Sequence, residues 1–79
     1  MAEKPGGVVK VIELVGSSTS SFSDAVREAV RIASKSVRNI QGVEVLGSNA
    51  TVGSNGEIEN YKVHCKVAFL IEEGALGNE

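Results

Sequence analysis

A chain of 79 residues with a single cysteine has few ways to stabilise a fold. A domain this short buries little apolar surface per residue, and natural examples usually add disulfides, a structural metal or partner subunits. One cysteine, Cys65, makes no intrachain disulfide, and together with the one histidine, His64, it falls short of the four ligands of a structural zinc site. Subunit association remains, so the sequence predicts one domain that works as a homo-oligomer.

Charge and hydropathy exclude several classes of protein. The net charge of -2 and the lack of a basic block interleaved with aromatic residues argue against nucleic-acid binding. No apolar run approaches the roughly 18–20 residues of a membrane span. The first seven residues lack the apolar centre of a secretory leader. A lone unpaired cysteine is typical of a reducing compartment, so the predicted location is the cytoplasm.

The first half of the chain predicts a strand followed by a helix. Residues 1–7 contain a proline and two glycines and are predicted to form a flexible leader. Residues 8–15 are rich in β-branched side chains and predict a strand that stops at Gly16. Apolar residues then recur at three- and four-residue steps, which predicts a helix from Phe22 to Val37 or Arg38.

The ends and the outer face of this helix carry polar residues. Ser21, with Asp24 three places on, predicts an N-terminal cap, because a side-chain oxygen can accept a hydrogen bond from a free backbone N–H group. A second stripe at helical spacing is basic and consists of Arg27, Arg31, Lys35 and Arg38. We interpret this stripe as a solvated face, with an anionic ligand or an acidic neighbouring subunit as the alternative.

The second half of the chain predicts a hairpin. Residues 43–52 form the next strand, and their alternation shifts at Gly47, which predicts a bulge or bend there. Residues 53–56 end in Asn-Gly and predict a tight turn. From Tyr61 to Ile71 apolar residues alternate regularly, so we expect the odd-numbered set to pack on the helix. Residues 74–79 are predicted to be a flexible tail, which leaves 8–73 as the domain.

The elements combine into an α+β fold of β-α-β-β order, with one helix on a three-stranded antiparallel sheet. One helix covers one sheet face only, and the other face still carries apolar residues. Long strands also leave edges that invite pairing. Symmetric assembly of several subunits covers the apolar sheet face and the free strand edges.

In its order of motifs the chain resembles the dodecin family. The segments that carry the resemblance are 11–18 (Val-Ile-Glu-Leu-Val-Gly-Ser-Ser), the helix 22–40, Val-Glu-Val at 43–45, Tyr-Lys-Val at 61–63 and Val-Ala-Phe at 67–69. Together they span residues 8–73. The resemblance implies a sheet wrapped around its helix and a hollow homododecamer of tetrahedral symmetry. It also implies storage or sequestration of a flavin, riboflavin or FMN, stacked in pairs at two-fold axes, and no enzymatic activity.

Two positions depart from the flavin-binding pattern of the resembled family. Gly42 stands where those proteins have a tryptophan that stacks on the flavin, and Lys62 stands where they have a glutamine that binds the flavin ring. Val43, Glu44 and Val45 would neighbour this pocket. Since an aromatic pair contributes about 0.5–1.5 kcal/mol beyond its buried area, the missing ring argues against the usual stacked mode. The resemblance also extends to members without that tryptophan, for which calcium binding has been proposed.

The remaining polar residues leave alternatives open. Gly42 is either the left-handed residue that ends the helix or the space left by the tryptophan, and Lys62 pairs with Glu44 or contacts an anionic ligand. Adjacent strand residues point to opposite faces, so His64 and Cys65 are not expected to act together. We interpret Cys65 as a buried apolar residue and His64 as a neutral interface residue. The candidate calcium ligands are scattered: Glu13, Asp24, Glu44, Glu57, Glu59, Glu72 and Glu73.

A catalytic site is not predicted, because no nucleophile–base pair or convergent acid–base set is visible in the sequence. Three functions remain: an oligomer that stores or sequesters a small ligand such as a flavin, an oligomer that binds calcium or another metal ion at residues that the sequence does not identify, and a structural oligomer with no dedicated ligand.

Overall fold

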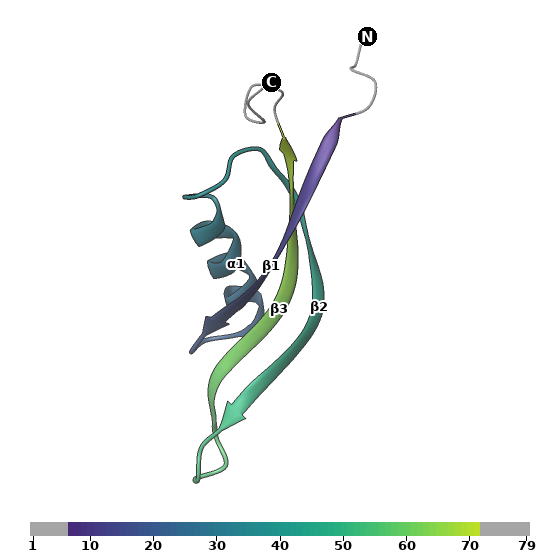
Figure 1. Ribbon diagram of the computed structural model, residues 1–79. Coiled ribbons are helices and arrows are strands. Elements are labelled where there is room, and N and C mark those ends of the chain that lie inside the picture. Colours follow the sequence, from purple (N-terminus) through teal and green to yellow (C-terminus); the bar gives the residue numbers. More distant parts are fainter. Residues whose placement is uncertain (1–6, 72–79) are drawn as a thin grey trace.

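The computed structural model describes residues 7–71, and they form one helix on a three-stranded sheet (Figure 1). The elements are β1 (Val8–Ser18), α1 (Phe22–Ala33), β2 (Ile40–Val52) and β3 (Ile58–Ile71). The sheet order is β1-β3-β2, and β3 pairs antiparallel with both neighbours. The predicted α+β fold of β-α-β-β order is confirmed. Apart from Gly7, the predicted leader 1–7 and tail 74–79 lie outside the described residues.

Strand β1 continues past the glycine at which we predicted its end. Its pairing with β3 runs without interruption from Val8 opposite Ile71 to Ser18 opposite Tyr61. Gly16 is buried inside the strand, because α1 passes directly over it. A Cβ atom at Gly16 would overlap the carbonyl oxygen of Ala25 and lie 2.9 Å from Ala29 Cβ. The glycine therefore permits close helix–sheet packing and does not end the strand.

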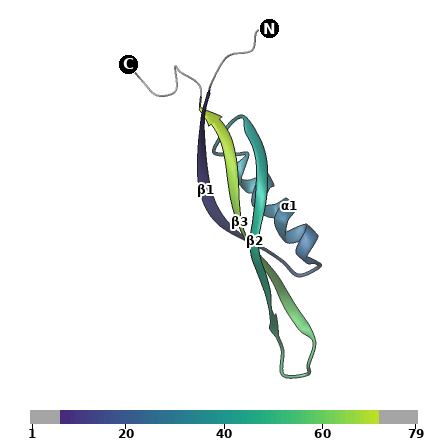
Figure 2. The same cartoon turned by 90° about the vertical axis from the view of Figure 1, so that its right-hand side faces the viewer.

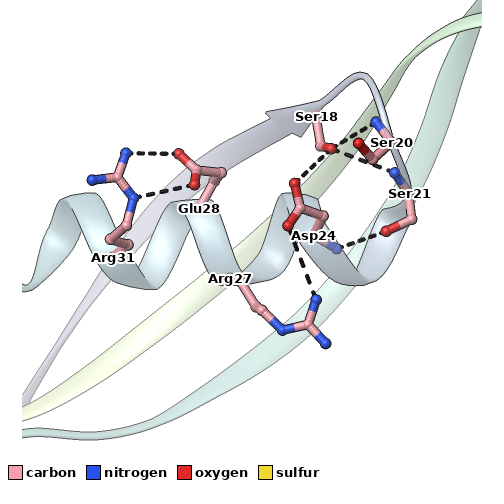
Figure 3. Close-up of polar contacts among 7 residues, drawn as sticks. All are labelled: Ser18, Ser20, Ser21, Asp24, Arg27, Glu28 and Arg31. Carbon is pink, nitrogen blue, oxygen red and sulfur yellow. Dashed lines mark hydrogen bonds and ion pairs between the residues drawn. The ribbon is translucent and has the colours of Figure 1, made fainter.

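The N-terminus of α1 is capped as predicted, with one additional partner (Figure 3). The Ser21 hydroxyl accepts a 3.0 Å hydrogen bond from the Asp24 N–H group. The Asp24 carboxylate accepts a 2.9 Å hydrogen bond from the hydroxyl of Ser18, which in turn accepts from the Ser20 N–H group at 2.8 Å. These bonds tie the helix start to the end of β1, and an acidic residue near an N-terminus also complements the helix dipole.

Helix α1 ends at Ala33, four residues before the earlier of the two predicted ends. Beyond it the hydrogen bonds tighten to three-residue spacing, from Lys35 N–H to Ile32 C=O at 3.0 Å and from Ser36 N–H to Ala33 C=O at 2.9 Å. Serine competes for backbone hydrogen bonds and is a weak helix former, which accounts for the early end. The left-handed residue after the helix is Asn39, with φ 62°, so the interpretation of Gly42 as that residue is wrong.

The predicted β2–β3 hairpin is present, but each strand begins three residues before its predicted start, β2 at Ile40 and β3 at Ile58. Its register shifts between Val45 and Gly47, which confirms the predicted irregularity at Gly47. The register also shifts near each end of β2. In the turn, the Gly56 N–H group donates to the Gly53 carbonyl at 2.9 Å, and Gly56 has φ 83°. A glycine suits that backbone conformation because it has no Cβ to clash.

The core lies between α1 and the sheet and is built from small side chains. Its buried members are Ala25, Ala29 and Ala33 of α1 and Val63, Cys65 and Val67 of β3. This confirms that the odd-numbered residues at the centre of β3 face the helix and that Cys65 is buried. Helix α1 packs mainly on β1 and β3, and it touches β2 only slightly.

Much of the apolar surface lies outside this core. The large apolar side chains exposed among residues 7–71 are Val8, Val9, Val11, Val15, Phe22, Ile32, Val43, Val45, Leu46, Val52, Ile58 and Leu70. The molecule is also elongated, with a radius of gyration of 16.3 Å, whereas a compact chain of this length has about 11–12 Å. No helix in the described part of the chain is long and apolar enough to cross a membrane.

We predict that Gly16→Ala destabilises the protein, because the added methyl group has to push α1 away from β1. Overpacking of this kind costs about 1–3 kcal/mol in the free energy of unfolding, which urea denaturation measures. Gly47→Ala is the matched control, since no atom lies within 4 Å of a Cβ placed on that strand glycine. Equal stability of the two variants would contradict the close packing at Gly16.

Candidate functional site

The face of the sheet opposite α1, which we call the helix-free face, carries most of the candidate site residues. Strand alternation and register determine its membership. It consists of Val9, Val11, Glu13, Val15 and Ser17 of β1, Gly42, Glu44, Gly47 and Asn49 of β2, and Lys62, His64, Lys66, Ala68 and Leu70 of β3. Valines and charged side chains therefore share one open surface.

A shallow cavity of about 350 Å³ opens on the helix-free face near the start of β2. It is lined by Val11, Gly42, Val43, Glu44, Lys66 and Ala68. No atom lies within 4 Å of a Cβ placed on Gly42, so the glycine leaves free space beside the apolar floor. Among the six lining residues, Glu44 and Lys66 are the charged ones, and the register places them directly opposite each other.

Three of the five predicted site residues meet at this cavity and two do not. Gly42, Val43 and Glu44 line it. Val45 pairs with the buried Cys65, so its side chain projects from the face that carries α1. Lys62 pairs with Ser17 and Asn49 and lies six residues from Ala68 along β3, about 20 Å at the usual rise per residue. A single subunit therefore does not bring Lys62 to Gly42.

The charged residues of the helix-free face form a row across all three strands. The register places Lys66 between Glu13 of β1 and Glu44 of β2, so the predicted pairing of Lys62 with Glu44 is wrong. The Nε2 atom of His64 lies 2.9 Å from Glu13 Oε1. The sequence did not indicate this contact, because it depends on the register between two strands that lie 51 residues apart.

Metal binding by one subunit finds no support within residues 7–71, where no three His, Cys, Asp or Glu side chains gather in a way that could hold an ion. Glu13 and Glu44 share the helix-free face, but β3 separates their strands by two strand spacings, about 10 Å. The Asp24 carboxylate accepts a hydrogen bond from the Ser18 hydroxyl at the start of α1, and Glu57 and Glu59 lie at the hairpin end. Glu72 and Glu73 fall outside the described residues.

Cys65 lies on the other side of β3 from His64 and is 0% exposed. Desolvation by the surrounding core raises the pKa of its thiol, because burial disfavours the charged thiolate. The thiolate is the nucleophilic form of cysteine, so this position opposes reactivity. Cys65 is thus part of the packing and not of the candidate site.

Two arginines of the predicted basic stripe pair within α1 (Figure 3). Arg31 donates two hydrogen bonds to the Glu28 carboxylate, at 2.9 Å and 3.1 Å, and this contact lowers the pKa of Glu28. Arg27 lies 4.0 Å from Asp24. Both pairs are exposed, and exposed pairs contribute little to stability. Two of the four basic residues of the stripe thus lie beside a carboxylate of their own helix, which partly neutralises their charge.

Comparison with known proteins gives consistent matches. A sequence profile of the dodecin family matches residues 8–72. The chain is 35% identical over 68 residues to a dodecin of Thermus thermophilus, covering 86% of this chain and 97% of the relative. It is 37% identical over 62 residues to a Mycobacterium tuberculosis protein named calcium dodecin, covering 78% of this chain and 86% of the relative.

Solved structures share the fold described above. The dodecin from Streptomyces coelicolor matches with a TM-score of 0.83 at 30% identity, covering 89% of this chain and 99% of that one. The calcium dodecin from Mycobacterium tuberculosis, whose structure is described as having a novel calcium-binding site, matches with a TM-score of 0.72 at 35% identity. The latter match covers 82% of this chain and 91% of that one.

We predict that Cys65 does not react with a thiol reagent such as DTNB while the protein is folded. Burial raises the pKa of the thiol, so a smaller fraction of it is ionised at pH 8 than of an ordinary cysteine, and the core blocks access. One equivalent should react after unfolding in urea, which provides the internal control. Fast stoichiometric reaction of the folded protein would show that Cys65 is accessible.

Proposed function

The chain belongs to the dodecin family, and we propose on this premise that it forms a hollow homododecamer that holds a small ligand between its subunits and catalyses no reaction. The observation that carries the proposal is how the apolar side chains are divided between the buried core and the exposed surface. Within residues 7–71 the buried core consists of three alanines, two valines and one cysteine, whereas twelve valine, leucine, isoleucine and phenylalanine side chains, such as Val15 at 64% exposure, lie on the open surface. Burying one such side chain stabilises by about 1.5–3 kcal/mol, so contacts between subunits are strongly favoured.

The proposed ligand site needs two subunits. Gly42 and Lys62 correspond to the two flavin positions of the family, yet about 20 Å of β3 separates them within one chain. They share the helix-free face, so a two-fold axis that brings two such faces together can set Lys62 of one subunit beside Gly42 of the other. The shallow cavity at Gly42 is then half of the site, and the partner subunit completes it.

A flavin-like planar ring is the ligand that the cavity supports best. Val11 and Ala68 supply apolar contact, while Glu44 and Lys66 offer a hydrogen-bond acceptor and a donor at the rim. Because Gly42 supplies no stacking partner, we expect riboflavin or FMN to bind more weakly than in dodecins that carry the tryptophan. A protein that binds such a ligand and does not react with it can store or sequester it.

Calcium is the second candidate ligand, favoured by the 37% identity to the relative named calcium dodecin. Calcium takes six to eight oxygen ligands, usually including several carboxylates. Glu13 and Glu44 give each helix-free face two carboxylates, and a two-fold axis doubles that number. Lys66 lies between them and opposes a cation, which is why we place calcium second.

Two titrations of the assembled protein distinguish the ligands. We expect added riboflavin to lose fluorescence at micromolar protein, because two flavin rings bound as a stacked pair at a two-fold axis quench each other by contact. Calcium is expected to leave the heat of mixing and the melting temperature unchanged. Unchanged riboflavin emission at high protein, together with a rise in melting temperature on adding calcium that a chelator reverses, would show that the ligand is calcium and not flavin. A negative result in both titrations would leave a structural oligomer without a dedicated ligand.

Restoring an aromatic ring at position 42 should strengthen flavin binding. Gly42→Trp fills free space next to the cavity, and a stacked pair contributes about 0.5–1.5 kcal/mol, equivalent to about 2- to 13-fold in the dissociation constant. Gly47→Trp is the matched control, because Gly47 lies in the same strand and on the same face with equally open space but outside the cavity lining. An equal gain in both variants would show that the cavity at Gly42 is not the flavin site.

A further inference from the structure

Lys62 is a half-buried cation of the central strand β3, on the helix-free face of the sheet. Figure 2 looks onto this face, with β3 between β1 and β2 and with α1 behind the strands. Within residues 7–71, no ion pair or side-chain hydrogen bond involves Lys62. Removing a charge partly from water costs free energy that a partner of opposite charge offsets, so Lys62 is suited to an anion.

The strand register places a neutral hydrogen-bond donor on each side of Lys62. Ser17 of β1 lies opposite it on one side and Asn49 of β2 on the other, and both project from the same face. Neighbouring strands are about 5 Å apart, so the three side chains form one short row. An ammonium, a hydroxyl and an amide all donate hydrogen bonds, and this row therefore fits a group with several acceptor oxygens.

The carboxylates near this row are held elsewhere in the same subunit. Glu13 and Glu44 flank Lys66, four residues farther along β3 and about 13 Å from the row that contains Lys62. The Glu59 carboxylate lies against the backbone at the start of the hairpin turn. The positive charge of Lys62 is therefore not balanced by a carboxylate of the described part of its own subunit.

We propose that Lys62, with Ser17 and Asn49, binds a phosphate group of the ligand, so that the protein selects phosphorylated ring compounds such as FMN over riboflavin. The inference rests on the proposed function, in which Lys62 of one subunit lies beside the Gly42 cavity of another. The ring then occupies the cavity, and the phosphate reaches the row at Lys62. Riboflavin ends in a neutral hydroxyl, so it lacks the charge-assisted hydrogen bonds that a phosphate accepts.

The ratio of the two dissociation constants, measured by fluorescence titration of each flavin, tests the selection. We expect the unmodified chain to bind FMN about 10-fold more tightly than riboflavin, the effect of one hydrogen bond to a charged group. Lys62→Gln should bring the ratio close to one, whereas Lys62→Arg, which keeps the charge, should preserve it. Lys10→Gln is the matched control, because it removes the same charge from the helix side of the sheet. An unmodified chain that binds both flavins equally, or a ratio unchanged in Lys62→Gln, overturns the inference.

Inorganic phosphate provides an independent test on the unmodified chain. It should weaken FMN binding and leave riboflavin binding unchanged, compared with sodium chloride at the same ionic strength, because riboflavin does not occupy the row at Lys62. Phosphate that affects both flavins equally would show a general salt effect and would contradict the phosphate site.

Native mass spectrometry separates ligand binding from a role of Lys62 in assembly. Lys62→Gln should keep the mass of the unmodified assembly. Loss of that mass would assign Lys62 to a contact with a carboxylate of another subunit and overturn the phosphate site. Equal binding of the two flavins would overturn this inference alone and leave the proposed function standing, whereas an assembled chain that binds neither flavin would overturn the proposed flavin site itself.

Discussion

The close packing of α1 against β1 and β3 through small side chains constrains everything else in this molecule. Gly16 lets the helix approach the sheet, and Ala25 and Ala29 supply no bulk between them. The resulting core is thin, and the large apolar side chains remain outside it. Because a folded domain is stable by only about 5–15 kcal/mol, leaving that surface in water is strongly unfavourable for a chain of this size. We therefore propose that assembly is part of how the chain folds.

The same constraint accounts for the place of the candidate ligand site. A core this thin has no room for an interior pocket, so the cavity at Gly42 is shallow and opens on the helix-free face. Such a site gains walls only when another subunit covers it. In the proposed assembly, folding, association and ligand binding are coupled, so a substitution that weakens one of them is expected to weaken the others.

The sequence predicted the elements well because its local signals were strong. Alternation in β3, the serine cap of α1 and the glycine turn of the hairpin each depend on neighbouring residues, and each was found in place. The errors came from contacts distant in sequence. The predicted strand end at Gly16 was wrong because the sequence does not show the helix that passes over it, and the Lys62–Glu44 pair failed because the register of β2 against β3 includes bulges that the sequence only partly reveals. The contact between His64 and Glu13 depends on register in the same way.

The most direct test of the coupling between assembly and folding is a dilution series that follows mass and secondary structure together. Light scattering reports the mass of the particle, and circular dichroism reports its strands and helix. We predict that the strand and helix signal disappears at the concentration at which the assembly dissociates, so that no folded single subunit is seen at any dilution. A folded particle of 8.2 kDa that persists at nanomolar concentration would contradict this coupling.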